Sequence, residues 1–260
     1  MKSGIIKISV ILAYGQMLTV NALANALPIN GKTTGALSDQ LANLFTPQGF
    51  TFAIWGLIYT LLLVFVIGIA VLPLDSLRQR ISQWFVGNTL LNSAWIFAWH
   101  FQWLFLSLLI MLGLLYTLIR IQLQLKKLKK GNDLLLLSLP FAVYFGWITV
   151  ATIANTTAVL IGSGWAAWGV TAAYWTVAVL LIGLGIALSQ LLYFKKIAYA
   201  AAILWGYWGI YSKHTDAIGF DNQYPLIVNT VQFCLLMLLL AMLGTGLARF
   251  KKKKIPTVRS

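Results

Sequence analysis

Tryptophan is the residue type in this sequence that is best suited to form a binding surface. The chain holds 11 tryptophans in 260 residues. Five of them fall within long apolar runs: Trp55, Trp95, Trp147, Trp175 and Trp205. Polar side chains lie close to two of these rings in the sequence: Asn92, Thr149, Thr152 and Asn155. Large flat rings beside a few amide and hydroxyl groups suit a flat, mostly apolar ligand, although packing between helices would account for the same residues.

Other residues that could carry chemistry are sparse. No Glu occurs, and every aspartate lies in or beside an expected loop: Asp39, Asp75, Asp133, Asp216 and Asp221. His100 and His214 fall at a helix end and in a loop, where interfacial polar residues are common, and Cys234 has no partner for an internal disulfide. The sequence has no metal-ligand spacing, no phosphate-binding glycine loop and no Ser, His, Asp set. We therefore expect no catalytic residues, no metal ion and no cofactor.

The composition indicates which elements must position the tryptophans. Hydrophobic residues make up 60% of the chain and charged residues 9%, with a mean hydropathy of +0.85. Apolar runs of roughly 18 to 25 residues are long enough to cross a bilayer as helices, and they lack the period-two alternation of barrel strands. The fold class predicted is all-α, a polytopic membrane bundle of about eight transmembrane helices. They are expected at about residues 5–27, 50–73, 84–101, 103–125, 134–156, 167–189, 193–212 and 224–248.

The net charge of +14 indicates membrane topology and no nucleic-acid partner, because the 19 Lys and Arg residues form short clusters between apolar runs. In the eight-helix threading, all of them except Lys32 and Lys213 fall on one side. This bias predicts N and C termini in the cytoplasm and fits a bacterial cell inner membrane. Four tryptophans near expected helix ends fit an aromatic belt at the headgroups: Trp84, Trp103, Trp165 and Trp168.

The N-terminal segment, the polar segment after it and the C-terminal tail each need a separate interpretation. Lys2, Lys7 and the small residues at 24–26 resemble a signal peptide, whose removal would leave seven helices, whereas Asn21 favours a retained helix inside a bundle. The polar segment from residue 28 to 49 is long for a connection, and either a lid or an exposed loop without a role would explain it. The tail at 251–260 begins with four lysines that suit anionic lipid headgroups.

Motifs in three of the expected helices resemble those of a known family. They are PQGFTFAIWGLIY at residues 47–59, LNSAWIF at 91–97 and PFAVYFGWITVATIAN at 140–155. In this order they resemble the TspO/MBR family, the tryptophan-rich sensory proteins related to the mitochondrial translocator protein, over about residues 5–160.

The resemblance implies a five-helix bundle that binds porphyrins or other flat hydrophobic molecules in a pocket under a long first loop. It would place six residues at the pocket: Trp55, Asn92, Trp95, Trp147, Ala151 and Asn155. Residues 1–160 would form the bundle, 161–250 three additional transmembrane helices packed on it, and 251–260 a basic cytoplasmic tail. The additional helices would cover the face through which smaller relatives dimerise, so a homodimer is expected to be less obligate. Asn155-Thr156-Thr157 departs from the sterol-linked pattern of mitochondrial members, so sterol recognition is not implied.

Three functions remain open at this point. The first is an integral membrane ligand-binding sensor or regulator, whose partners would be membrane lipid and a hydrophobic small molecule such as a tetrapyrrole. The second is a transporter or facilitator of a small hydrophobic molecule, with Asn92 and Asn155 along its path. The third is an enzyme that degrades a bound porphyrin under light, which the resemblance to bacterial members allows and the residues themselves do not establish.

Overall fold

A computed structural model describes residues 3–27, 29–41, 43–126, 128, 133–165 and 170–254 of the chain, with side chains up to residue 248. These residues form helices and no strand, which confirms the all-α class. The eight long helices are α1 (Ser3–Ala26), α3 (Ile54–Val71), α4 (Ser76–His100), α5 (Leu104–Leu125), α6 (Leu139–Gly162), α7 (Ala172–Phe194), α8 (Ile197–Thr215) and α9 (Pro225–Lys254). Shorter elements are α2 (Thr34–Gln40), the 3-10 turns Ile29–Gly31 and Gly49–Ala53, and the π-helical turn Leu134–Ser138. Trp168 lies outside the described residues.

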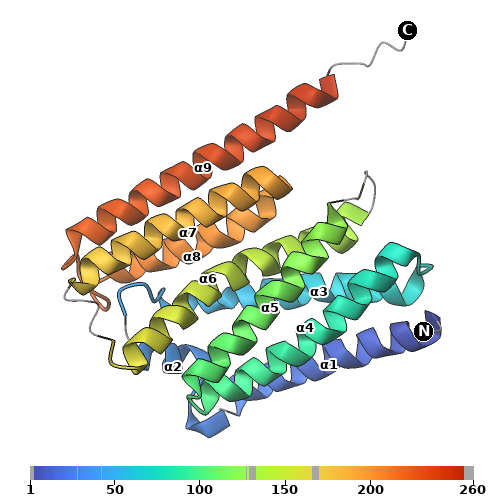
Figure 1. The fold of residues 1–260 in the computed structure, drawn as a ribbon, viewed down its shortest axis with the longest axis horizontal. Helices are drawn as coiled ribbons and strands as arrows, with labels where there is room; N and C mark the ends of the chain where they lie inside the picture. Colours follow the sequence, from blue (N-terminus) through green and yellow to red (C-terminus); the bar gives the residue numbers. More distant parts are fainter. Residues whose placement is uncertain are drawn as a thin grey trace.

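Six helical segments of the described chain are long and apolar enough to cross a membrane. They are Ser3–Ala26, Gly49–Val71, Leu104–Leu125, Leu134–Gly162, Ala172–Phe194 and Pro225–Ala248. α4 and α8 are not among them, because their sequences carry more polar side chains. Both helices nevertheless lie alongside the others and run in the same general direction (Figure 1).

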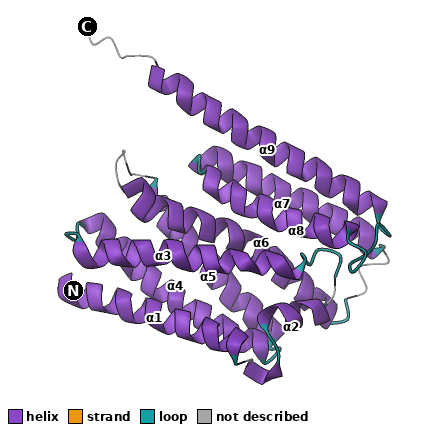
Figure 2. Cartoon of the chain, turned by 180° about the vertical axis from the view of Figure 1, so that it is seen from behind, coloured by secondary structure: helices purple, strands orange, loops and turns teal. Residues whose placement is uncertain are grey.

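The helices form two groups that meet along α6 (Figures 1 and 2). α1, α3, α4, α5 and α6 make one bundle, and α7, α8 and α9 lie beside it. α8 lies close against α6 at Gly146, where a Cβ would collide with the carbonyl oxygen of Tyr199. Aromatic side chains fill the bundle core, as Phe65 does by packing edge-on against Phe85 and Phe141. α6 is therefore the shared wall of both groups.

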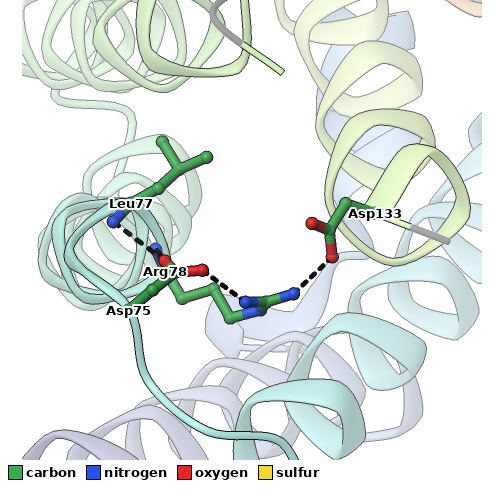
Figure 3. Close-up of polar contacts among 4 residues, drawn as sticks. All are labelled: Asp75, Leu77, Arg78 and Asp133. Carbon is green, nitrogen blue, oxygen red and sulfur yellow. Dashed lines mark hydrogen bonds and ion pairs between the residues drawn. The ribbon is translucent and has the colours of Figure 1, made fainter. Parts of the chain in front are cut away.

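α4 begins at Ser76, about two turns before the start that the apolar pattern predicts at residue 84. The Asp75 carboxylate caps the helix by accepting hydrogen bonds from the backbone N–H groups of Leu77 and Arg78. The Arg78 guanidinium also pairs with Asp75 and reaches Asp133 before α6 (Figure 3). A hydropathy pattern does not detect this helix start, because the residues that form it are charged.

The start of α1, the ends of α5 and α9, the π-helical turn before α6 and the α3–α4 and α7–α8 connections all lie at one end of the molecule (Figure 1). We call it the basic end, because Lys7, Arg78, Lys126, Lys195 and Lys196 belong to these segments. The described residues between 27 and 53, here called the first loop, lie at the opposite end. The predicted segregation of charge thus matches the arrangement of the helices.

Candidate ligand-binding site

The aromatic residues predicted for the pocket converge from three helices. Trp147 on α6 packs edge-on against Trp55 on α3, with ring centroids 6.5 Å apart. Phe52 of the first loop also meets the Trp147 ring edge-on, at 5.9 Å. Trp95 on α4 stacks on Trp99 one turn later, with centroids 5.5 Å apart and planes 17° from parallel. The rings are fixed by mutual packing, which preserves flat walls for a ligand.

A cavity of about 50 Å³ lies between α4, α6 and the first loop, and we call it the α4–α6 cavity. Four of the residues predicted for the pocket line it: Trp95, Trp147, Ala151 and Asn155. The first loop closes it with polar and apolar residues: Thr34, Ser38, Leu41, Asn43, Thr46, Pro47 and Phe52. The long loop therefore covers the site, which is the position that the lid interpretation requires.

A second cavity of about 150 Å³ lies between α1, α3 and α4, and we call it the α1–α3 cavity. Trp55 lines it together with Tyr59 and the amide side chains of Asn21 and Asn25. Three residues line both cavities: Thr34, Phe52 and Trp95. The two spaces are thus separated by side chains rather than by a backbone wall.

Two indole groups at these cavities lack hydrogen-bond partners. The Nε1 atoms of Trp95 and Trp147 are buried, and neither has a partner among the described residues. A buried donor left without an acceptor costs about 1–3 kcal/mol. By contrast, Trp99 donates its Nε1–H to the carbonyl oxygen of Thr34 at 3.3 Å. Both tryptophans line the α4–α6 cavity, so a ligand that reaches their indole N–H groups with an acceptor oxygen or nitrogen would satisfy these donors.

Asn92 and Asn155 occupy different surroundings. Asn92 lines neither of these two cavities; its Oδ1 accepts from Asn21 at 2.7 Å, and its Nδ2 donates to the Tyr144 hydroxyl at 3.0 Å. Asn155 lines the α4–α6 cavity and donates its Nδ2–H to Ser107 Oγ on α5 at 3.0 Å. Asn92 therefore links three helices behind the pocket, whereas Asn155 forms part of its wall.

The bundle holds one part of the first loop through the end of α4. His100 is fully buried; its Nδ1 donates to the carbonyl oxygen of Ile29 at 2.9 Å, and its Nε2 lies 3.1 Å from Thr34 Oγ1.

The sequence pattern did not single out Trp99 for the pocket, although Trp99 lines the α4–α6 cavity. Its position four residues after Trp95 is the signal that could have found it, because both lie on one helix face.

α8 holds the other part of the first loop. His214 Nε2 donates to the carbonyl oxygen of Leu44 at 2.8 Å, and Trp205 Nε1 donates to that of Thr51 at 2.9 Å. Gly209 lies so close that a Cβ there would collide with Thr51 Cγ2. The loop therefore connects the five-helix bundle to the additional helices.

Gln48 adds a side-chain link between the first loop and the segment after α8. Its Nε2 donates to Asp216 Oδ2 at 2.9 Å, and its backbone N–H donates to the carbonyl oxygen of Gly209 at 3.0 Å. The backbone N–H of Ile218 and then the Gln48 amide lower the pKa of Asp216 below its ordinary value. The carboxylate consequently stays ionised and able to accept the Gln48 bond at neutral pH.

Residues 7–244 match a family model described as TSPO-like protein. The match extends past residue 160, where the motif resemblance ends, and covers α7, α8 and most of α9. No curated protein and no solved structure matches the chain. Since the family model covers most of its length and its helices include membrane-spanning candidates, the chain is an integral membrane protein of the TSPO-like family.

Proposed function

We propose that this protein is a membrane sensor or regulator that binds a flat, mostly apolar ligand beneath the first loop. The observation that carries the proposal is that Trp95 and Trp147 both line one cavity and that the indole N–H groups of both are buried without a partner among the described residues. A ligand acceptor at this point would recover the cost of two buried donors. The aromatic walls favour a planar ring system.

The sizes of the cavities indicate how such a ligand would enter. Volumes of about 50 and 150 Å³ are smaller than the roughly 300–1,000 Å³ of typical small-molecule sites. Phe52 lies between the two spaces and belongs to the first loop. Displacement of the loop together with Phe52 would join the cavities into one site lined by Trp55, Trp95 and Trp147. In this proposal, the loop position described above is the closed state of a lid.

A porphyrin is the ligand class that we infer. Its planar ring matches the aromatic walls, and its carboxylates supply acceptors for indole N–H groups. Because the first loop is hydrogen-bonded to α8, opening the loop for a porphyrin would also disturb the additional helices. Binding would therefore be transmitted from the pocket to α7–α9, which is the behaviour expected of a sensor.

We also infer the orientation in the membrane. α4 has 25 residues, which is about 37 Å of helix and enough to span a hydrocarbon core. The amide and hydroxyl side chains in its middle, at Asn88, Thr89, Asn92 and Ser93, are buried, so they need not contact lipid. With α8 as the other polar span, eight helices cross, and the positive-inside rule puts the basic end in the cytoplasm of a bacterial inner-membrane protein.

The test is a titration of the detergent-purified protein with protoporphyrin IX, followed by the shift of the porphyrin absorbance band. The Trp55→Leu/Trp147→Leu variant removes two aromatic walls and the unpartnered N–H donor of Trp147. We expect its affinity for the porphyrin to fall roughly tenfold or more. The matched control is Trp84→Leu/Trp208→Leu, which removes two tryptophans that line neither cavity. Equal affinity in the two double variants would refute the proposed site.

A further inference from the structure

A crevice along α8 lies outside the pocket beneath the first loop. Its first part, about 220 Å³, is at the basic end, where Ser138, Lys196 and Ala198 line it. Its second part, about 450 Å³, lies between α3, α6 and α8 and begins at the same Ala198. The two parts share Ala198 and therefore lie next to each other along α8, one beside a cation and the other along an apolar wall.

The apolar part presents one face of α8. Ala198, Ala201, Ala202 and Trp205 follow the spacing i, i+3, i+4 and i+7, which aligns them along the helix. The only polar atom of Trp205, its Nε1, is already bonded to the carbonyl oxygen of Thr51. Leu57 of α3 lines the opposite side and is 52% exposed. An extended hydrocarbon chain suits this wall, because the small alanines leave a furrow and no polar atom is left unpaired.

The charged part belongs to the basic end of the molecule. Lys196 donates its Nζ–H to Ser138 Oγ at the start of the crevice. Lys126 also belongs to the basic end, and its Nζ lies 3.4 Å from the ring centroid of Tyr193, near the end of α7. An ammonium carries three donors, so Lys196 can contact Ser138 and a phosphate oxygen together. The charge at this end complements an anionic headgroup.

The length of the crevice matches one leaflet of a bilayer. Nine residues separate Lys196 from Trp205, which corresponds to about 14 Å along an α-helix. One leaflet contributes about half of a hydrocarbon core roughly 30 Å thick. The 450 Å³ of the apolar part also falls within the range of small-molecule sites, about 300–1,000 Å³.

We propose that this crevice binds one anionic phospholipid, with its phosphate at Lys196 and an acyl chain along Ala198–Trp205. The lipid would fill the space between α3 and α8, next to the close contact of α6 and α8 at Gly146. It would thereby support the junction between the five-helix bundle and the additional helices.

Native mass spectrometry of the full chain in detergent tests this site. Phosphatidylglycerol and phosphatidylcholine with identical acyl chains are added in equal amounts, and the retained lipid is measured. We expect the unaltered protein to retain phosphatidylglycerol roughly fivefold over phosphatidylcholine. Lys196→Gln should abolish this preference. Lys195→Gln is the matched control, because Lys195 is exposed and lines neither part of the crevice, and it should keep the preference.

A second variant tests the apolar part. Ala201→Phe would fill the furrow and should reduce the retention of both lipids, and size-exclusion chromatography with circular dichroism shows whether the variant is folded. Equal retention of the two lipids by the unaltered protein would overturn the proposal. So would a preference that survives Lys196→Gln, or unchanged lipid retention in folded Ala201→Phe.

Discussion

Asn92 shows how a residue near a pocket can act by supporting it. The chain of hydrogen bonds from Asn21 through Asn92 to Tyr144 joins α1, α4 and α6, and all three side chains are buried. Inside a membrane protein such bonds have no water to replace them when they are broken. Trp55, which packs against Trp147, also packs edge-on against Tyr144 at the end of this series of hydrogen bonds.

We predict that Asn92→Ala lowers the free energy of unfolding by about 1–3 kcal/mol, because Asn21 and Tyr144 lose a buried partner. The measurement is unfolding of the detergent-solubilised protein by SDS, followed by far-ultraviolet circular dichroism. Asn25→Ala is the control, since the Asn25 side chain is exposed and its bond to Asn21 O stays within α1. A loss in Asn92→Ala no larger than that in Asn25→Ala would contradict the supporting role.

At the residue scale, the sequence could predict which residues lie near the cavity, but it could not predict the hydrogen bonds that each of them makes. The motif resemblance selected Trp95, Trp147, Ala151 and Asn155, and these four residues line one cavity. The partners of Asn92 depend on α1 and α6, which are distant in the sequence, so no local pattern reveals them. The same holds for His100, which was expected at an interface and is buried against the first loop.

At the scale of the elements, the first loop is hydrogen-bonded to two helices that belong to different groups. It carries helix α2 and two 3-10 turns, and it is bonded to α4 through Ile29 and to α8 through Leu44. Gly209 permits the second attachment, because its missing side chain gives Thr51 and Pro47 room against α8.

We predict that Gly209→Ala loosens the segment around residues 47–53. The new Cβ would collide with Thr51 Cγ2 and lie 3.0 Å from Pro47 Cβ. Overpacking of this kind costs about 1–3 kcal/mol, so the amides there should exchange hydrogen roughly tenfold faster. Hydrogen-exchange mass spectrometry measures the rate.

Gly185→Ala is the matched control for this variant. It makes the same substitution within α7, where a Cβ would meet nothing within 4 Å. Exchange in the 47–53 segment should therefore stay unchanged. An equal response to both substitutions would show that Gly209 does not position the loop.

Helices were the most predictable elements. Apolar runs found all eight long helices within a few residues at most ends, since a membrane helix must be apolar along much of its length. The start of α4 was missed because Asp75 and Arg78 determine it through capping and ion pairing. α2 was missed because a seven-residue helix within a polar segment is stabilised by its tertiary contacts.

At the scale of the whole molecule, the first loop connects two groups of helices. Trp205 and His214 of α8 bond to a loop whose other residues cover the cavities of the five-helix bundle. The sequence indicated the additional helices, but it could not indicate that one of them holds the first loop, because these contacts join residues more than 150 positions apart. If the ligand enters beneath the first loop as proposed, its entry would be coupled to the packing of α8.

The most direct test of this account is to lock the first loop to α8. A Cβ at Gly209 would lie 3.2 Å from Thr51 Cβ, close to the roughly 3.5–4.5 Å of a disulfide. Thr51→Cys/Gly209→Cys, made with Cys234→Ser to remove the natural thiol, would therefore close the lid when oxidised and release it when reduced. Porphyrin binding is then measured on one protein in both redox states. We predict at least tenfold weaker binding in the oxidised state, with recovery after reduction. Equal binding in the two states would contradict entry beneath the first loop.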